Sequence, residues 1–281
     1  MKASVIGLGV VGNAMYQSFK TKISELPIVR DEDNEIIEKY VLYGYDKYKN
    51  IGTFEKCLDS SIIFLVLPTL FNNEIKGYDN SPTLEVLTNL ELNSYHGIVV
   101  IKSTVEPTFT DYVACKFPYM EIIHNPEFLS ASTAFDDFHN QKHVVLGRSC
   151  TCSDSCVEFV TEFYRDLYPN ATISTCTSTE SESMKIFCNS FYSVKLQFFN
   201  ELYLLSQKLG SSFEKIVELM IKNEWINPMH TKVPGTDGKL SYGGMCFPKD
   251  TNALLEFMKN NNTPCGILDA CVSERNSMRD D

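Results

Sequence analysis

The stretch Val5-Ile6-Gly7-Leu8-Gly9-Val10-Val11-Gly12 decides the fold. A short apolar strand runs into a G-x-G-x-x-G turn, and an apolar helix over residues 14–19 follows. In such a turn the first glycine permits the tight bend, the second lets a pyrophosphate approach the backbone, and the third lets the helix pack closely on the strand. The pattern predicts a dinucleotide-binding loop, with cofactor contacts from Gly7, Gly9, Val10, Val11 and Gly12.

The second apolar strand, residues 41–45, ends at an acidic residue, Asp46. In dinucleotide-binding folds an acid at this place accepts hydrogen bonds from the adenosine ribose hydroxyls. Here it comes later than the usual spacing of about 20 residues, because a charged insert around residues 30–39 precedes the strand. A carboxylate repels a 2′-phosphate, so the expected cofactor is NAD rather than NADP. The alternative interpretation of Asp46 is a solvated loop acid.

Strands and helices continue to alternate through the first half of the chain. Apolar strands are predicted at 62–66, 98–101, 121–123 and 143–146, and helices at 83–92 and 108–115. Such alternation is typical of a parallel sheet covered on both faces, so the predicted fold class is α/β, a doubly wound and mostly parallel sheet. Ligands of such sheets bind beyond the carboxyl ends of the strands. Cofactor contacts are therefore expected from Pro68, Thr69, Ser103 and Thr104, beside the loop 125–129.

In the second half the pattern becomes helical. Residues 183–209 carry apolar side chains at helical spacing, and Lys185 and Asn189 share one face of this helix. Shorter helices are predicted near 213–222, 249–259 and 266–277. We therefore expect two domains, a dinucleotide-binding domain over 1–178 and a helical domain over 179–281.

The stretch Gly243-Gly244-Met245-Cys246-Phe247-Pro248-Lys249-Asp250 places a cysteine between a glycine turn and a proline that suits the first turn of a helix. The thiol then lies near the positive end of a helix dipole with Lys249 close by, and both effects favour the thiolate. Asp250 follows about one turn later, where it can act as a base. The stretch is typical of a prepared nucleophile, and a buried structural cysteine is the alternative interpretation.

The composition argues against several classes of protein. The 281 residues carry a formal net charge of −11 with no concentrated basic stripe, which argues against nucleic acid as a partner. No apolar run is long enough to span a membrane, and the first strand begins too early to leave room for a signal peptide, so a cytoplasmic protein is expected. The ten cysteines are then expected to be free thiols. Cys150, Cys152 and Cys156 match no common zinc-site spacing, so no metal is expected.

These motifs, in this order, resemble those of the UDP-glucose 6-dehydrogenase family, which includes GDP-mannose 6-dehydrogenases. The resemblance runs over nearly the whole chain. Besides the two glycine turns it rests on Lys102-Ser103-Thr104-Val105, Asn125-Pro126-Glu127-Phe128-Leu129, Glu182-x-x-Lys185-x-x-x-Asn189 and Asn200-Glu201. It implies a Rossmann-like domain, a helical central domain that carries the cysteine loop, and NAD as cofactor. It also implies oxidation of a nucleotide sugar at C6, from alcohol to acid, in two hydride transfers, with UDP-glucose as the expected substrate.

The resemblance implies that Cys246 is the nucleophile, and the chemistry agrees. An alcohol passes to an acid through an aldehyde, which yields a second hydride only after something has added to it. Cys246 would add to the aldehyde, giving a thiohemiacetal and then a thioester that water hydrolyses.

The same resemblance implies the other catalytic roles. Lys185 and Asn189 would hold the C6 oxygen and stabilise its negative charge. Asp250 would take a proton or position water, Thr104 would order that water, and Glu127 would be the base in thioester hydrolysis. Taken singly, each residue has a structural alternative, such as a solvated lysine, a helix cap or an ordinary loop residue. Substrate contacts are expected from Phe128, Leu129, Lys185, Asn189, Lys239, Tyr242 and Gly243.

The loop before Cys246 supplies the last three of these contacts. Residues 233–244 are rich in glycine and suited to cover a site. We expect Lys239 and the loop glycines at the diphosphate, and Tyr242 packed on the sugar or base. For Lys239 the alternative is a solvated loop charge.

Two features depart from the family's pattern. Ala131 stands where the family has a second glutamate, four residues after Glu127, so one substrate or cofactor contact is absent or supplied otherwise. The sequence also stops at Asp281, within the counterpart of a long central helix, whereas typical members continue into a second nucleotide-binding-like domain that holds much of the UDP. Three alternatives follow: the loop 233–244 and the N-terminal domain bind the substrate instead, a partner subunit binds it, or it is not bound at all.

The central helix of relatives also builds a dimer. Its counterpart here, residues 266–278, carries an apolar patch of Ile267, Leu268, Ala270, Cys271 and Val272. An exposed apolar patch favours a partner, so a homodimer is expected.

Two other functions fit parts of the sequence. A β-hydroxyacid dehydrogenase of the 6-phosphogluconate type shares the sheet and helical architecture but needs no nucleophilic cysteine. A non-catalytic, NAD-binding remnant would have lost its substrate domain. The presence of the nucleophile together with all its expected partners speaks against such decay.

Overall fold

The computed structural model describes residues 1–30 and 33–280. The chain divides into two compact units, Met1–Thr69 with Asp79–Lys185, and Leu70–Tyr78 with Ile186–Asp281. The first unit contains the glycine turn near the N-terminus, and the second contains the Cys246 stretch. The predicted domain limits, 1–178 and 179–281, stay a prediction.

The first unit is built on one large sheet, which has seven strands within the described residues. These are β1 (Lys2–Ile6), β4 (Val41–Tyr45), β5 (Ile62–Leu65), β8 (Ile98–Ile101), β9 (Glu121–His124), β10 (His143–Arg148) and β11 (Thr172–Thr177). Their order across the sheet is β11-β10-β9-β8-β5-β1-β4. Neighbours pair in parallel except β9 with β10, which are antiparallel. The predicted fold class is confirmed.

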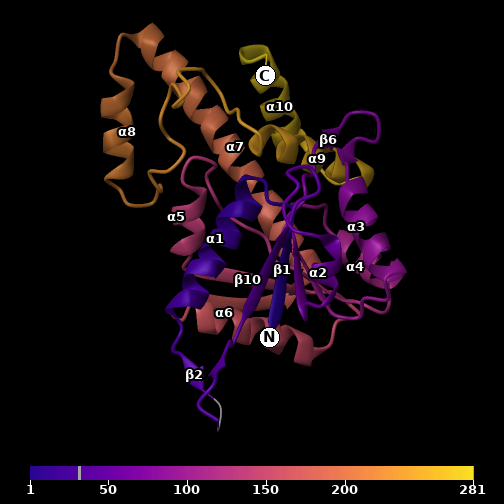
Figure 1. Ribbon diagram of the computed structural model, residues 1–281. Helices are drawn as coiled ribbons and strands as arrows, with labels where there is room; N and C mark the ends of the chain where they lie inside the picture. Colours follow the sequence, from indigo (N-terminus) through magenta and orange to yellow (C-terminus); the bar gives the residue numbers. More distant parts are fainter. Residues whose placement is uncertain (31–32, 281) are drawn as a thin grey trace. The chain divides into compact units, whose positions relative to one another are not determined.

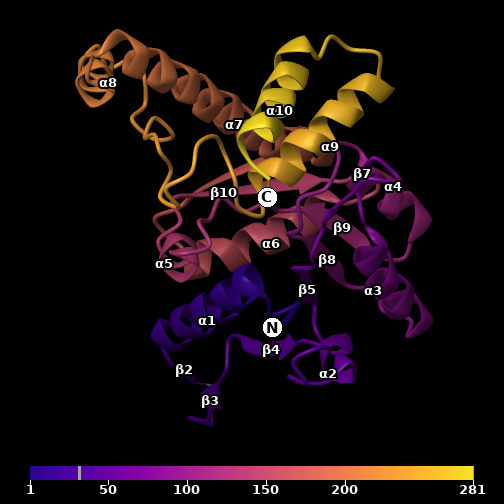
Figure 2. The same cartoon turned by 90° about the horizontal axis from the view of Figure 1, so that it is seen from above.

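Helices cover both faces of this sheet, as Figures 1 and 2 show. One face packs against α1 (Val10–Glu25), α5 (Ala134–His139) and α6 (Asp154–Leu167), and the other against α2 (Phe54–Leu58), α3 (Ser81–Leu92) and α4 (Phe109–Lys116). The central strands β5 and β8 are buried along their whole length. Continuous burial explains why these strands are apolar at every position rather than at alternate positions.

The chain order across the sheet identifies where a ligand binds. β1 lies between β4 and β5, so the chain leaves β1 toward one side and returns to the other. In doubly wound sheets this reversal opens a crevice at the carboxyl ends of the strands. The loops that follow β1, β4, β5, β8 and β9 all begin at that edge, because these strands run in parallel.

Two small hairpins and one edge strand had no counterpart in the sequence-based prediction. The hairpin of β2 (Val29–Arg30) and β3 (Ile36–Ile37) lies in the charged insert, whose residues 31 and 32 are outside the described part of the chain. The second hairpin, β6 (Phe71–Asn72) with β7 (Gly77–Tyr78), belongs to the second unit. The edge strand β11 reads Thr-Ile-Ser-Thr-Cys-Thr and is partly exposed, so it lacks the apolar run that reveals a central strand.

The second unit is mostly helical. Its helices are the part of α7 (Ser178–Leu209) beyond residue 185, α8 (Phe213–Ile221), α9 (Phe247–Asn260) and α10 (Gly266–Met278), which correspond to the helices predicted from sequence. α9 and α10 lie side by side in Figure 2 and share an apolar core that includes Leu254, Leu268 and Val272. Across the described residues, none of the helices has both the length and the apolar character that crossing a membrane requires.

The apolar patch expected on residues 266–278 is not exposed, so that expectation is wrong. Leu268, Cys271 and Val272 are buried, and Leu268 and Val272 pack in the core shared with α9. Of the large side chains in the expected patch, Ile267 stays exposed, at 78%. The helix uses its apolar face inside its own unit, and the patch therefore gives no support for a homodimer.

Candidate active site

The turn between β1 and α1 shows why each glycine stands where it does. Gly7 has a φ of +91°, and a Cβ there would lie 2.3 Å from the Val66 carbonyl oxygen. A Cβ on Gly12 would lie 1.8 Å from the Gly7 carbonyl oxygen. A Cβ on Gly9 would meet nothing within 4 Å. The protein's own packing thus requires Gly7 and Gly12, whereas Gly9 leaves open space at the start of the helix.

Asp46 joins the end of β4 to this turn. Its Oδ2 accepts a hydrogen bond of 2.8 Å from the Leu8 N–H, and its Oδ1 accepts bonds of 3.0 Å from the N–H groups of Tyr48 and Lys49. The Lys49 ammonium donates to the Leu8 carbonyl oxygen at 2.5 Å. A carboxylate is therefore held beside the glycine turn, where sequence placed it, and its contact with a ribose stays a prediction.

The start of α1 can hold an anion. Gly9 is the N-cap residue and offers no side chain to the first N–H groups of the helix. A pocket of about 430 Å³ opens there, lined by Gly9, Val10, Asn13 and Lys49 and, from the other side, by residues 131–136. Ala131, at the position where a glutamate was expected, is part of this lining. Open space, unused N–H donors and a nearby lysine suit a pyrophosphate.

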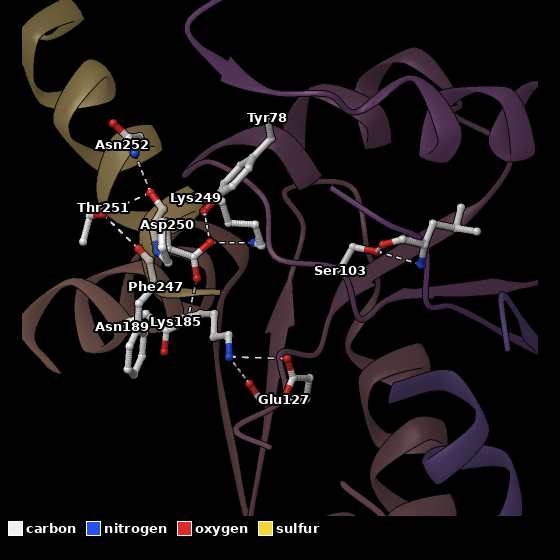
Figure 3. Close-up of polar contacts among 12 residues, drawn as sticks. Tyr78, Ser103, Glu127, Lys185, Asn189, Phe247, Lys249, Asp250, Thr251 and Asn252 are labelled. Carbon is white, nitrogen blue, oxygen red and sulfur yellow. Dashed lines mark hydrogen bonds and ion pairs between the residues drawn. The ribbon is translucent and has the colours of Figure 1, made fainter. Parts of the chain in front are cut away.

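The loops after β5 and β8 are tied together at the same edge of the sheet. The Ser103 hydroxyl donates to the Leu67 carbonyl oxygen at 2.8 Å and accepts from the Leu67 N–H at 3.0 Å (Figure 3). Thr104 and Thr69 are buried beside this link, and Pro68 is exposed. The link places the predicted cofactor residues of both loops close together.

Lys185 and Glu127 form a buried pair in the first unit. Lys185 is only 4% exposed, and its ammonium donates to the Glu127 carbonyl oxygen and lies 3.5 Å from Glu127 Oε1 (Figure 3). The ammonium also lies over the Phe128 ring, 4.7 Å from its centre. The Leu129 N–H donates to Glu127 Oε2 at 2.7 Å. The structure thus brings together four residues that the sequence predicted for the site.

Asp250 is the centre of a second cluster, in the second unit. It is fully buried, and three donors reach its carboxylate: Tyr78 and Lys249 at Oδ1, both 2.5 Å, and Asn189 at Oδ2, 2.6 Å (Figure 3). A buried carboxylate needs such donors to offset the loss of water. Asn189 and Asp250 were both predicted for the site, whereas Tyr78 was missed because it lies in the unexpected hairpin.

Cys246 is exposed and stands at the start of α9, one turn before Asp250. It is the N-cap residue, Pro248 lies in the first turn, and the Asp250 N–H donates to the Cys246 carbonyl oxygen at 3.0 Å. The expected local structure is therefore present. A thiol at this place is accessible to a substrate and lies at the positive end of the helix dipole.

Two domain descriptions of one enzyme family match this chain. The NAD-binding domain of the UDP-glucose/GDP-mannose dehydrogenase family matches residues 20–168, and the central domain of the same family matches residues 179–277. The chain belongs to this family. Membership makes it an NAD-dependent oxidoreductase, and the residues around Gly9 and Asp46 fit that cofactor.

Individual relatives agree with this assignment. The UDP-glucose 6-dehydrogenase of Campylobacter jejuni is 25% identical over 99% of this chain and 72% of its own length. Among solved structures, a UDP-glucose dehydrogenase from Pyrobaculum islandicum superposes with a TM-score of 0.82 at 21% identity, over 98% of this chain and 68% of that one. A 3-hydroxyisobutyrate dehydrogenase from Mycobacterium tuberculosis has a TM-score of 0.70 at 14% identity, over 97% and 91% of the two chains. These structural likenesses show the fold.

Two charged residues of the family motifs were left without a role by the sequence. Lys102 is buried, and its ammonium donates to Asn125 Oδ1 at 3.0 Å and to the Pro126 carbonyl oxygen at 3.3 Å. Burial lowers the pKa of Lys102 to about 7, against the opposing effect of the Glu127 carboxylate. Lys102, which directly follows β8, thus holds the residues next to Glu127 from a buried position.

Glu182 is the second of these residues. It is fully buried, and its two oxygens accept hydrogen bonds from the N–H groups of Thr108, at 2.6 Å, and Thr110, at 2.7 Å. It thereby caps the start of α4 from α7, three residues before Lys185. Burial raises the pKa of Glu182 to about 7, although these hydrogen bonds oppose the shift.

The expected substrate role of Tyr242 does not fit its position. Its side chain is 2% exposed, with its hydroxyl 3.3 Å from Thr251 Oγ1 and the Arg275 guanidinium 6.0 Å from the ring centre. The ring is part of the core and presents no face to a sugar or base. Gly243 packs against the Arg279 guanidinium, which a Cβ would approach to 2.3 Å, and Lys239 is exposed.

Proposed function

We propose that the protein oxidises UDP-glucose to UDP-glucuronate with NAD, through a covalent intermediate on Cys246. The observation that carries the proposal is an exposed thiol at the start of α9, one turn from a buried carboxylate that three donors hold. The choice of UDP-glucose rests on the relatives named above. Their identity of about a quarter supports the reaction class more strongly than the particular sugar.

NAD, when bound, supplies the acceptor for the hydride. The glycine turn and the start of α1 would hold its pyrophosphate, and Asp46 its adenosine ribose. The linked loops at Pro68, Thr69, Ser103 and Thr104 would line the nicotinamide half. The pocket at Gly9 and Asn13 supports the proposed place of the pyrophosphate.

Cys246 would act on the aldehyde stage of the substrate. The sulfur adds to C6, a C–S bond forms, and the carbonyl oxygen takes up a proton to give a thiohemiacetal. The oxidised form of this adduct is a thioester, and water cleaves its C–S bond to release the acid and the thiol. A covalent bond between sulfur and C6 gives both the accessible thiol and the polar cluster around Asp250 a use.

The two polar clusters would serve this chemistry at different stages. Lys185 and Asn189, one turn apart on α7, would donate to the C6 oxygen. Asp250 and Thr104 would position the attacking water, and Glu127, paired with Lys185, would take its proton. Phe128, Leu129 and, from the loop 233–244, the exposed Lys239 would contact the rest of the nucleotide sugar.

A panel of nucleotide sugars tests the reaction class directly. The protein is incubated with NAD and each sugar in turn, and the NADH formed is compared with the sugar consumed. We expect UDP-glucose to give two NADH per sugar. One NADH per sugar, with an aldehyde or ketone as product, would contradict oxidation to the acid.

A second enzyme class, the β-hydroxyacid dehydrogenases, is the alternative, because the chain shares its fold with a 3-hydroxyisobutyrate dehydrogenase. Such an enzyme removes one hydride and needs no thiol. A Cys246→Ala variant with full turnover of a small β-hydroxy acid would favour it. A matched control is Cys265→Ala, which changes the cysteine at the N-cap of α10. A non-catalytic NAD-binding protein would bind NAD but no nucleotide sugar in calorimetry.

We also propose that the protein works in the cytoplasm as a homodimer. The support for the homodimer comes from α7, where Phe191, Phe198 and Leu205 are exposed at spacings of seven residues and therefore lie on one helix face. Sedimentation equilibrium at micromolar concentration should give twice the mass of the chain. A monomer that turns over at full rate would contradict the proposal.

A further inference from the structure

We propose that four buried side chains, those of Gln197, Asn200, Arg275 and Arg279, act as positioning residues for the nucleophile. Together they hold the segment Leu240–Gly243, which leads into the turn before Cys246. We call these four side chains the loop clamp. The inference rests on the proposed role of Cys246. It assigns a function to Asn200, which belongs to the Asn200-Glu201 motif that the catalytic chemistry does not use.

The first half of the loop clamp comes from α7 and holds Ser241. The Ser241 N–H donates to Asn200 Oδ1 at 2.8 Å, and the Ser241 hydroxyl donates to Gln197 Oε1 at 2.5 Å. Gln197 and Asn200 are each 2% exposed. Ser241 has a φ of +59°, a conformation that is costly for a residue with a side chain. Two buried hydrogen bonds hold it there.

A further contact fixes the orientation of the Gln197 amide. Its Nε2 donates to Glu274 Oε2 at 2.7 Å, so its Oε1 is the atom turned toward Ser241. Glu274 lies on α10, one residue before Arg275. The α7 half of the loop clamp is thus connected to the helix that supplies the other half.

The second half comes from the end of α10 and holds the residues on either side of Ser241. Arg279 Nη1 donates to the Leu240 carbonyl oxygen at 3.3 Å, and Arg275 Nε donates to the Tyr242 carbonyl oxygen at 3.2 Å. Arg279 also pairs with Asp237 at 2.6 Å. The same guanidinium packs against Gly243, where a Cβ would approach it to 2.3 Å.

These contacts hold the backbone of three successive residues, 240–242, with buried polar groups. Loops that carry reactive residues are usually more mobile than the helices around them. Burying two arginines and two amides costs free energy unless each finds partners. Asn200 and the two arginines find theirs in the loop backbone, and Gln197 finds its partners in the Ser241 hydroxyl and the Glu274 carboxylate. From Tyr242 the chain needs only the Gly243–Gly244 turn and Met245 to reach Cys246, so holding 240–242 limits where the sulfur can lie.

None of the four residues is placed among the groups that would touch the reacting atoms. Their expected effect is on orientation, because a misplacement of about 1 Å can cost about 100-fold in rate. Loss of one contact should therefore lower kcat more than it raises KM. It should leave NAD binding unchanged, since the NAD-binding residues lie in the first unit.

Asn200→Leu is the test variant, because leucine has a similar size and no acceptor for the Ser241 N–H. Hydrogen–deuterium exchange of the peptide covering residues 240–246 should speed up about tenfold. Where the protein turns over, kcat should fall by about 10- to 100-fold and KM should change by less than about threefold. Asn200→Asp keeps an acceptor oxygen and should recover most of both effects.

Asn261→Leu is the matched control. Both asparagines donate to the carbonyl oxygen four residues earlier, Asn200 to Leu196 at 2.7 Å and Asn261 to Phe257 at 2.8 Å. Asn261 is exposed and lies at the end of α9, so it should change neither exchange at 240–246 nor kcat. If Asn200→Leu fails to fold, Ser241→Ala removes the Gln197 contact alone and replaces it in the test.

Unchanged exchange at residues 240–246 in the folded Asn200→Leu variant would overturn the clamp. Faster exchange with an unchanged kcat would overturn its role in positioning. The proposed role of Cys246 fails separately, if Cys246→Ser oxidises UDP-glucose at the wild-type rate. The exchange measurement needs no turnover, so the two failures can be told apart.

Discussion

Helices α1 and α9 both begin after a glycine turn, but they differ in the residue at the N-cap. Each helix follows a glycine turn, and in each the residue at the N-cap is exposed. At α1 that residue is Gly9, with open space where a Cβ would be. At α9 it is Cys246, and the first turn adds Lys249 and the buried Asp250.

The difference indicates how one local structure serves two purposes. A helix start without a side chain offers its N–H groups to an anion, which suits the pyrophosphate of NAD. A helix start that carries a thiol offers a reactive atom at a place that favours its charged form. A third helix start, that of α4, is closed to ligands because the buried carboxylate of Glu182 already accepts from its N–H groups.

Removing the thiol should give the largest effect. For Cys246→Ala we expect the rate of UDP-glucuronate formation to fall by at least about 1,000-fold, because no covalent adduct can form. The dissociation constant for NAD, from calorimetry, should stay within about twofold, since Gly9 and Asp46 are untouched. A proportionate loss of NAD binding would show that the two helix starts do not have separate purposes.

Filling the open turn should have the next largest effect. Gly9→Val should weaken NAD binding by about 100-fold, an amount comparable with other overpacking costs, while thermal unfolding stays close to that of the wild type. Gly12→Ala is the contrasting variant, because its Cβ would lie 1.8 Å from the Gly7 carbonyl oxygen. It should lower the free energy of unfolding by about 2 kcal/mol. If Gly9→Val and Gly12→Ala lowered the free energy of unfolding equally, Gly9 would be required by packing rather than by the ligand.

The buried carboxylate of Glu182 at the start of α4 should make the free energy of unfolding depend on pH. The pKa of Glu182 is raised from 4.5 to about 7, so the folded state binds this proton more tightly than the unfolded state. Its contribution is fully present below about pH 4.5 and is lost as the pH rises through about 7. Between about pH 5 and about pH 8 the free energy of unfolding of the wild type should fall by about 2 kcal/mol more than that of Glu182→Gln. Parallel curves from urea unfolding of the two proteins would show that Glu182 does not titrate in this range.

The sequence predicted most of the fold because the signals were local. The Gly7–Gly12 turn, the apolar central strands and the helical spacing of residues 183–209 each follow from neighbouring residues. The polar edge strand β11 and the hairpin that carries Tyr78 were missed. Strand β11 is half exposed and has no continuous apolar run, and a hairpin of two-residue strands is too short to show a period.

The candidate site was predicted only in part, because the spacing of residues along the chain does not show which distant residues come into contact. The sequence placed Asp250 near Cys246 and Glu127 after a strand. It did not show that Tyr78 and Asn189 donate hydrogen bonds to Asp250. It also gave Tyr242 a place on the ligand and residues 266–278 an exposed patch, although both pack inside their own unit. The sequence does not distinguish an aromatic or apolar side chain that contacts a ligand from one that packs in the core.

The most direct test of the account is the mass of the protein caught during turnover. Glu127→Gln should slow thioester hydrolysis, so that reaction with NAD and UDP-glucose leaves the UDP-glucuronyl group on the chain. We predict that peptide mapping by mass spectrometry finds this added mass on Cys246 and that hydroxylamine removes it. Formation of UDP-glucuronate with no adduct at Cys246, or with an adduct on another residue, would contradict the account.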